Sequence, residues 1–188
     1  MICLLAIGNV LMGDDALGPF ALAQFEARWN LPAGVCTFDA GTPGLDLTLF
    51  LDGMDALIVL DAIKAKGPPG TVRTFGNEDL AAGRLPIVVS PHEPTLREAL
   101  LRLTLLGRAP KDVLLIGAIP ELIATGAPLS ATVRRALPEI EAQILLELRR
   151  LGAGVTPRVP VAEAKIWWEP LPRPPQGDRA CASPSPAG

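Results

Sequence analysis

Apolar runs of strand length alternate along this chain with stretches of helical periodicity. Residues 15–29 and 130–151 repeat apolar side chains every three or four positions, as helices do when one face packs on a core. Four other runs are short and nearly uninterrupted, as in strands buried on both faces of a parallel sheet: 2–7, 35–38, 56–60 and 113–119. The alternation predicts an α/β fold with a mainly parallel sheet covered by helices on both faces.

Weaker signals predict the remaining elements. Residues 43–50 indicate a short helix, and 71–75 indicate a strand that follows the turn at 66–70. Pro94 fits the first position of a further helix. Ser130 is the expected N-cap of the last helix, which Pro138 is expected to kink or restart.

The composition changes near the end of the last predicted helix. We expect an α/β domain over residues 1–153 and a proline-rich extension over 154–188, disordered from about Pro170 onward. Ile166-Trp167-Trp168 is the exception, because two of the three tryptophans of the chain fall there. These side chains are expected to dock on the chain's own core, with a partner-binding element as the alternative.

Composition and charge exclude several classes of protein. The net charge of −3 comes without a basic stripe, which argues against nucleic-acid binding. No window reaches the roughly 18 apolar residues of a membrane span, and residues 1–13 lack the basic start of a signal peptide. The three cysteines show no CxxC or zinc spacing. A cytoplasmic protein without contact to a membrane is therefore expected.

Three aspartates and the only histidine fall where predicted strands end or helices begin: Asp15, Asp39, Asp61 and His92. In an open α/β sheet such positions converge at the carboxyl edge of the strands, where ligands bind at the topological switch point. Carboxylates with one imidazole would make a metal site of oxygen ligands and one nitrogen. His92 precedes a helix amino terminus, whose field keeps the ring neutral as a ligand must be. We expect Asp15, Asp61 and His92 to lie within about 3–7 Å of one another.

Each of these residues also has a plain structural interpretation. Asp14 and Asp15 could cap the first helix, and Asp39, in an Asp-x-Gly-Thr sequence, could serve only its own turn. His92 could be an ordinary surface or core residue. Asp61 is harder to explain in this way, because a buried carboxylate is costly unless it meets a cation or donors. Phosphate-binding patterns such as GxGxxG and GxxxxGK[ST] are absent, so a phosphate cradle is not expected.

Six motifs, in this order, resemble those of the nickel-iron hydrogenase maturation endopeptidases. The resemblance covers roughly residues 1–152, and the motifs are specific when taken together. They are Ile7–Pro19 with its Gly-Asn-Val-Leu-Met-Gly-Asp-Asp core, Asp39–Asp46, Leu60-Asp61-Ala62 with Gly67–Val72, Ser90-Pro91-His92, Ile116–Glu121 and Leu129-Ser130.

This resemblance implies a three-layer fold with a twisted five-stranded sheet. It also implies an endopeptidase that removes a short C-terminal extension from the precursor of a hydrogenase large subunit after nickel insertion. The matching motifs place the metal contacts on Asp15, Asp61 and His92 and the residue important for cleavage on Asp39. Position 15 is Glu in some members and Asp here. Nickel would be supplied by the precursor, with no permanently bound organic cofactor, and the protein is expected to be monomeric.

The residues themselves favour a weak metal site and leave the mechanism open. One nitrogen ligand and no HExxH make a poor permanent zinc site, so recognition of nickel already held by the substrate is expected. Either Asp39 or the metal would activate water or polarise the scissile carbonyl.

Two other functions remain as alternatives. A non-catalytic nickel-sensing assembly scaffold would dock on the precursor without cutting it. A receiver-like phosphoacceptor domain shares the acidic pair Asp14-Asp15 and the aspartate Asp61. Such a domain also needs a lysine after its later strand to hold the phosphoryl group, whereas in this chain the predicted strand 113–119 is followed by Pro120-Glu121.

Overall fold

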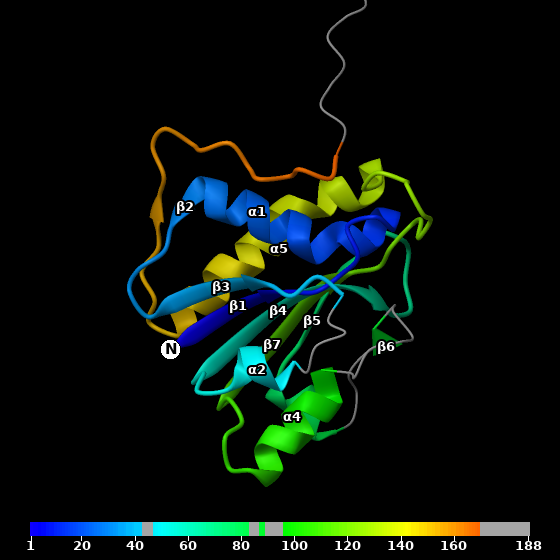
Figure 1. Ribbon diagram of the computed structural model, residues 1–188. Helices are drawn as coiled ribbons and strands as arrows, with labels where there is room; N and C mark the ends of the chain where they lie inside the picture. Colours follow the sequence, from blue (N-terminus) through cyan, green and yellow to red (C-terminus); the bar gives the residue numbers. More distant parts are fainter. Residues whose placement is uncertain (43–46, 83–86, 89–95, 170–188) are drawn as a thin grey trace, which may run out of the picture.

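The protein forms a twisted, mainly parallel sheet between two layers of helices (Figure 1). The computed structural model describes residues 1–42, 47–82, 87–88 and 96–169. The sheet order is β3-β1-β4-β7-β5, in which β5 alone runs antiparallel, and β6 (Ile87–Val88) pairs antiparallel with the end of β4. The five strands of this order are β1 (Ile2–Ala6), β3 (Val35–Asp39), β4 (Ala56–Lys64), β5 (Val72–Phe75) and β7 (Asp112–Ala118).

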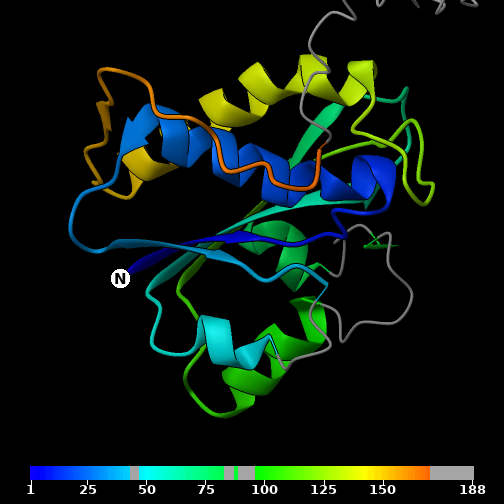
Figure 2. The ribbon, with the colours of Figure 1, turned by 45° about the horizontal axis from the view of Figure 1, so that its top comes forward.

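Helices cover both faces of the sheet, which confirms the predicted three-layer α/β class (Figure 2). On one face lie α1 (Leu17–Arg28) and α5 (Ala131–Arg150), and on the other lie α2 (Thr48–Leu51) and α4 (Leu96–Leu105). Strand residues alternate between these faces: Ile58 and Leu60 of β4 join the core under α1 and α5, whereas Leu57 and Val59 join the other core. In the described part of the chain, no helix is long and apolar enough to span a bilayer.

The chain order of the strands creates a switch point between β1 and β4. From β1 the chain passes through α1 to β3 on one side, and from β3 it passes through α2 to β4 on the other side of β1. The connections that leave β1 and β4 therefore diverge to opposite faces, and in open α/β sheets ligands bind at the carboxyl ends of two such strands. Asp15 follows β1 and Asp61 lies in β4, so the fold brings both to this switch point.

Two elements differ from the prediction in their extent. Strand β4 was expected to end at Leu60 but continues to Lys64, because the main chain of Asp61 and Ala62 pairs with Gly117 and Ala118 of β7. Helix α2 begins at Thr48 instead of residue 43; residues 43–46 lie outside the described part.

The last helix confirms one expectation and corrects another. Ser130 is its N-cap, and its hydroxyl accepts the Val133 N–H at 3.1 Å. The helix runs without interruption through Pro138, so the predicted restart is wrong. Pro138 has no N–H to donate to the preceding turn of the helix. Residues on both sides of it, such as Val133 and Ile144, pack on the same core, and this packing outweighs the loss of that hydrogen bond.

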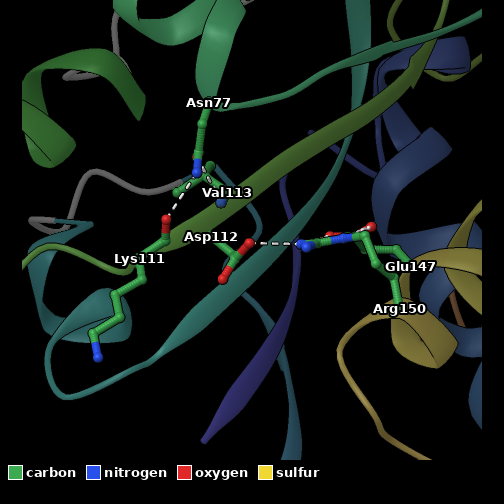
Figure 3. A network of polar contacts seen from close by, with 6 residues as sticks. All are labelled: Asn77, Lys111, Asp112, Val113, Glu147 and Arg150. Carbon is green, nitrogen blue, oxygen red and sulfur yellow. Dashed lines mark hydrogen bonds and ion pairs between the residues drawn. The ribbon is translucent and has the colours of Figure 1, made fainter.

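A short helix that the sequence analysis missed, α3 (Asn77–Ala81), anchors the amino end of β7 (Figure 3). The Asn77 side chain donates to the Lys111 carbonyl at 2.8 Å and accepts the Val113 N–H at 3.0 Å. Beside it, Arg150 of α5 pairs with Asp112 at 2.7 Å. These contacts hold the start of β7 in place. They therefore also set the position of its last residues, Gly117 and Ala118, beside Asp61 and Ala62 of β4.

Residues 151–169, the described part of the chain after α5, run back along α1, and we call this segment the strap. Strand β8 (Thr156–Pro157) pairs with β2 (Trp29–Asn30), and the Ala162 N–H donates to the Ala27 carbonyl at 2.9 Å. Ile166 and Trp168 pack against the core under α1 and α5, which confirms the predicted docking for these two side chains, whereas Trp167 is 78% exposed.

Two truncations test whether Ile166 and Trp168 of the strap stabilise the core. Removing residues 170–188 should leave the melting temperature nearly unchanged, because this segment is too polar and proline-rich to bury much apolar surface. Removing 166–188 should lower the free energy of unfolding by roughly 3 kcal/mol, the order expected for losing a packed tryptophan. Calorimetry of both proteins compares the two cuts, and equal stability after both would show that Ile166 and Trp168 do not support the core.

Candidate functional site

Two glycines allow the chain after β1 to rest directly on the ends of β1 and β4. At Gly8, with φ of 141°, a Cβ atom would lie 1.9 Å from the Asp15 carbonyl oxygen. At Gly18 it would lie 2.4 Å from the Leu60 carbonyl oxygen. Only glycine permits both approaches. They hold the 3-10 turn η1 (Gly13–Ala16) and the start of α1 at the switch point.

Asp15 is held inside this turn with its carboxylate nearly out of solvent. The residue is 6% exposed, and one carboxylate oxygen accepts the Asn9 N–H at 3.0 Å. Burial raises the pKa of Asp15 above its ordinary value, and the Asn9 N–H offsets part of that rise. The fold therefore places a carboxylate where its charge is costly, which is typical of a functional group.

Asp61 is still more deeply buried, at 1% exposed. It lies two residues from Val59 and from Ile63 on β4, so its side chain shares their face of the sheet, the one covered by α2 and α4. Its register partner on β7 is Gly117, where a Cβ atom would lie 2.5 Å from Ile63 Cγ2, so the Ile63 side chain fills this neighbouring position. Asp61 is therefore supplied to the switch point by the sheet, and Asp15 by the turn that leads into α1.

His92 lies outside the described residues, so the predicted triad with Asp15 and Asp61 stays a prediction. Among the residues that the structure describes, no group of three His, Cys, Asp or Glu side chains is arranged to hold a metal ion. The chain position of His92 remains informative, since it lies four residues before Leu96, where α4 begins.

Asp14 has a role that the sequence analysis missed. It is 0% exposed, and its carboxylate accepts main-chain N–H groups of Glu121 at 2.8 Å, Leu122 at 2.9 Å and Ser130 at 2.6 Å. Neither Asp14 nor Asp15 makes a side-chain cap on η1 or α1, so the helix-capping interpretation is wrong. Asp14 instead ties the turn that carries Asp15 to the loop between β7 and α5.

Asp39 is placed differently from the two buried aspartates. It ends β3 at the edge of the sheet, is exposed, and accepts the Gly41 N–H at 2.9 Å, which confirms that it stabilises its own turn. Its register partner is Ala6, level with Leu60, so two strand spacings of about 4.8 Å separate it from β4. Alternation along β3 also assigns its side chain to the α1 face, opposite to that of Asp61.

A cavity lies at the opposite end of the sheet from the switch point. It has a volume of about 680 Å³ and lies between α4 and the amino end of β7, where Arg97, Leu100, Thr104, Lys111 and Val113 line it. Asp15, Asp39 and Asp61 do not contribute to the wall of this cavity, and His92 lies outside the described residues. We therefore assign the candidate site by the carboxylates at the switch point and not by cavity size.

Because the charge of Asp15 is buried, its removal should make the protein more stable. At neutral pH, Asp15→Asn should raise the free energy of unfolding by roughly 0.5–2 kcal/mol, because an amide has no charge to desolvate and can still accept the Asn9 N–H. The folded-state pKa lies above the ordinary value of 3.8, so the penalty in the wild type exists above that range and disappears as the carboxyl protonates. Urea unfolding at pH 7 and about pH 3 measures the difference. An equal gain at both pH values would show that charge burial is not its cause.

Known proteins resemble this chain along most of its length. The model of the hydrogenase maturation protease family matches residues 21–147. The hydrogenase 2 maturation protease of Escherichia coli K12 is 34% identical over 158 residues, which span 84% of this chain and 96% of that protein. The hydrogenase expression/formation protein HupD of Bradyrhizobium diazoefficiens is 35% identical over 169 residues, 87% of this chain and 86% of its own.

Solved structures agree with this similarity. The hydrogenase maturating endopeptidase HybD of E. coli superposes with a TM-score of 0.77 at 33% identity and covers 84% of this chain and 98% of its own. The nickel-iron hydrogenase maturation protease HybD of Thermococcus kodakarensis gives 0.58 at 26% identity, over 78% of this chain and 97% of its own. With a family match over residues 21–147 and relatives above 30% identity, this chain belongs to the hydrogenase maturation protease family.

Proposed function

We propose that this protein is an endopeptidase that removes the C-terminal extension of a hydrogenase large-subunit precursor after nickel insertion. The single observation that carries the proposal is the pair of buried carboxylates, Asp15 and Asp61, at the switch point between β1 and β4. The E. coli relative is named as a maturation protease of hydrogenase 2, which supplies the class of substrate. Membership in a protease family argues against the receiver-like alternative.

Nickel bound in the precursor is the cation that we propose these carboxylates recognise. Two buried carboxylates at one end of the sheet concentrate negative charge and oxygen ligands there, which favours a divalent cation. Asp61 faces the side on which α4 lies, and the segment before α4 carries His92, the proposed third ligand. Oxygen ligands with one imidazole suit a borderline divalent ion that already has other ligands in the substrate. Specificity for a loaded precursor would follow, since an unloaded one offers nothing for the site to bind.

We propose that Asp39 acts in the catalytic step and does not bind the metal. It lies two strands away from Asp61, too far across the sheet to share an ion with it. A metal–oxygen bond is about 2 Å long, whereas the two strands are roughly 10 Å apart. Asp39 is exposed and ends a strand, so substrate can reach it. As a general base it would take a proton from water while the water oxygen attacks the scissile carbonyl. The proton would then pass to the leaving amine as the peptide bond breaks, which gives a new carboxyl terminus and a free peptide.

A processing assay separates this proposal from a nickel-sensing scaffold. The purified protein is incubated with nickel-loaded precursor, and the mass of the large subunit is followed. An endopeptidase shortens it, and Asp61→Asn should reduce the rate by at least about 10²-fold because substrate positioning is lost. Glu121→Gln, an exposed carboxylate at the same end of the sheet, is the matched control and should cut normally. Binding of the precursor without any change in its mass would establish the scaffold alternative instead.

A further inference from the structure

Strand β3 is an open edge of the sheet that leads to Asp39. It ends the strand order, with β1 on its inner side, and in the described part of the chain no strand pairs with its outer side. The Ile2 N–H bonds to the Gly34 carbonyl, and the Ala40 N–H bonds to the Ala6 carbonyl. In a parallel ladder with this register, residues 34, 36, 38 and 40 face β1, so Val35, Thr37 and Asp39 present their main-chain groups outward.

The outward groups form a regular row of donors and acceptors. The Val35 N–H is used by the Pro32 carbonyl at 3.2 Å, which leaves the N–H groups of Thr37 and Asp39 and the carbonyls of all three residues on the outer side. Natural sheets usually protect such an edge with lysine, proline or a bulge. Residues 35–39 read Val-Cys-Thr-Phe-Asp and contain neither lysine nor proline.

Side chains on both faces of β3 flank this edge. On the α2 face, Phe38 is 38% exposed and packs edge-to-face on Phe50, with ring centroids 5.7 Å apart. On the α1 face, the Thr37 hydroxyl donates to Glu26 at 2.5 Å, so the strand is held from that side by α1. A strand added to the edge would therefore find an aromatic surface on one face and polar groups on the other, next to a backbone already fixed in place.

We propose that the segment of the precursor that contains the scissile bond binds as an extra strand along the outer edge of β3. This inference rests on the proposed function and names how its substrate is held. Main-chain hydrogen bonds to Thr37 and Asp39 fix the extended peptide, as in other cases of strand addition. Because β3 ends at Asp39, the same alignment brings one peptide bond beside that carboxylate. Recognition of this kind runs through main-chain groups, so an edge strand can position a peptide bond without a side-chain pocket for each residue.

Amide hydrogen exchange measured by NMR tests the strand directly. In the free protein the Thr37 N–H should exchange fast, whereas the Phe38 N–H, which faces β1, should already be protected. Addition of nickel-loaded precursor to the Asp39→Asn protein should slow exchange at position 37 by at least 10-fold and leave position 38 unchanged. Cleavage of the precursor by the wild-type protein without any protection of Thr37 would overturn the strand while leaving the proposed function intact. A precursor that neither binds nor is cut would overturn both.

A pair of variants gives a second measurement. Thr37→Pro removes an N–H that makes no bond to β1 and is tolerated at an edge strand, while Thr37→Val removes only the hydroxyl. With cleavage of nickel-loaded precursor as the readout, Thr37→Pro should raise KM by at least 10-fold and Thr37→Val by less than 3-fold. Circular dichroism shows whether each variant is folded. A folded Thr37→Pro protein with normal KM would contradict the proposal.

Discussion

Asp14→Ala should lower the free energy of unfolding more than any other substitution of an aspartate or glutamate that we propose. Its carboxylate accepts three main-chain N–H groups in a site with no solvent exposure. Alanine would leave these donors buried without acceptors, at roughly 1–3 kcal/mol for each that water cannot reach. We expect a loss of at least about 3 kcal/mol in the free energy of unfolding, measured by urea denaturation.

The matched control for this change is Glu121→Ala. Glu121 lies in the same loop and is exposed, and alanine keeps the main-chain N–H that donates to Asp14. Its effect should stay within about 0.5 kcal/mol. A similar small effect for Asp14→Ala would mean that the loop between β7 and α5 does not depend on this carboxylate.

Asp39→Asn should have the largest effect on the chemical step. The amide preserves the shape of the side chain and can still accept the Gly41 N–H, but it cannot take a proton from water. We expect the rate of cleavage to fall by about 10²–10⁴-fold while loaded precursor still binds. Single-turnover assays with mass detection measure the rate, and size-exclusion chromatography detects the trapped complex.

The outcome for Asp39→Asn distinguishes catalysis from folding. The melting temperature should stay close to that of the wild type, because the residue is exposed and its hydrogen bond from the Gly41 N–H is kept. A variant that is folded and cuts at the normal rate would remove Asp39 from the reaction. A variant that no longer binds precursor would instead assign Asp39 to substrate recognition.

The sequence predicts the layers of this fold well because buried parallel strands leave long apolar runs. Strands β1, β3 and β7 and helices α1 and α5 follow directly from such runs and from helical periodicity. The extent of β4 could not be predicted in this way. Asp61 interrupts the apolar run, yet its main chain pairs with Gly117, and a side-chain pattern carries no information on that pairing.

Part of the candidate site could also be predicted from the sequence, and part could not. The aspartates at the switch point could be identified, because their position after apolar runs is visible in the sequence. The role of Asp14 could not be identified, since its partners are main-chain N–H groups 107, 108 and 116 residues away. The open edge of β3 depends on the strand order, which is a property of the folded sheet.

The most direct test of the account compares one precursor in two states. Nickel-loaded and nickel-free forms of the same large-subunit precursor are incubated with equal amounts of this protein, and intact mass is recorded over time. We predict that the loaded form is shortened at its C-terminus and that the nickel-free form stays intact even at high protein concentration, because the contact through Asp15 and Asp61 is missing. Efficient cutting of the nickel-free precursor would contradict recognition through nickel, and no cutting of either form would contradict the endopeptidase itself.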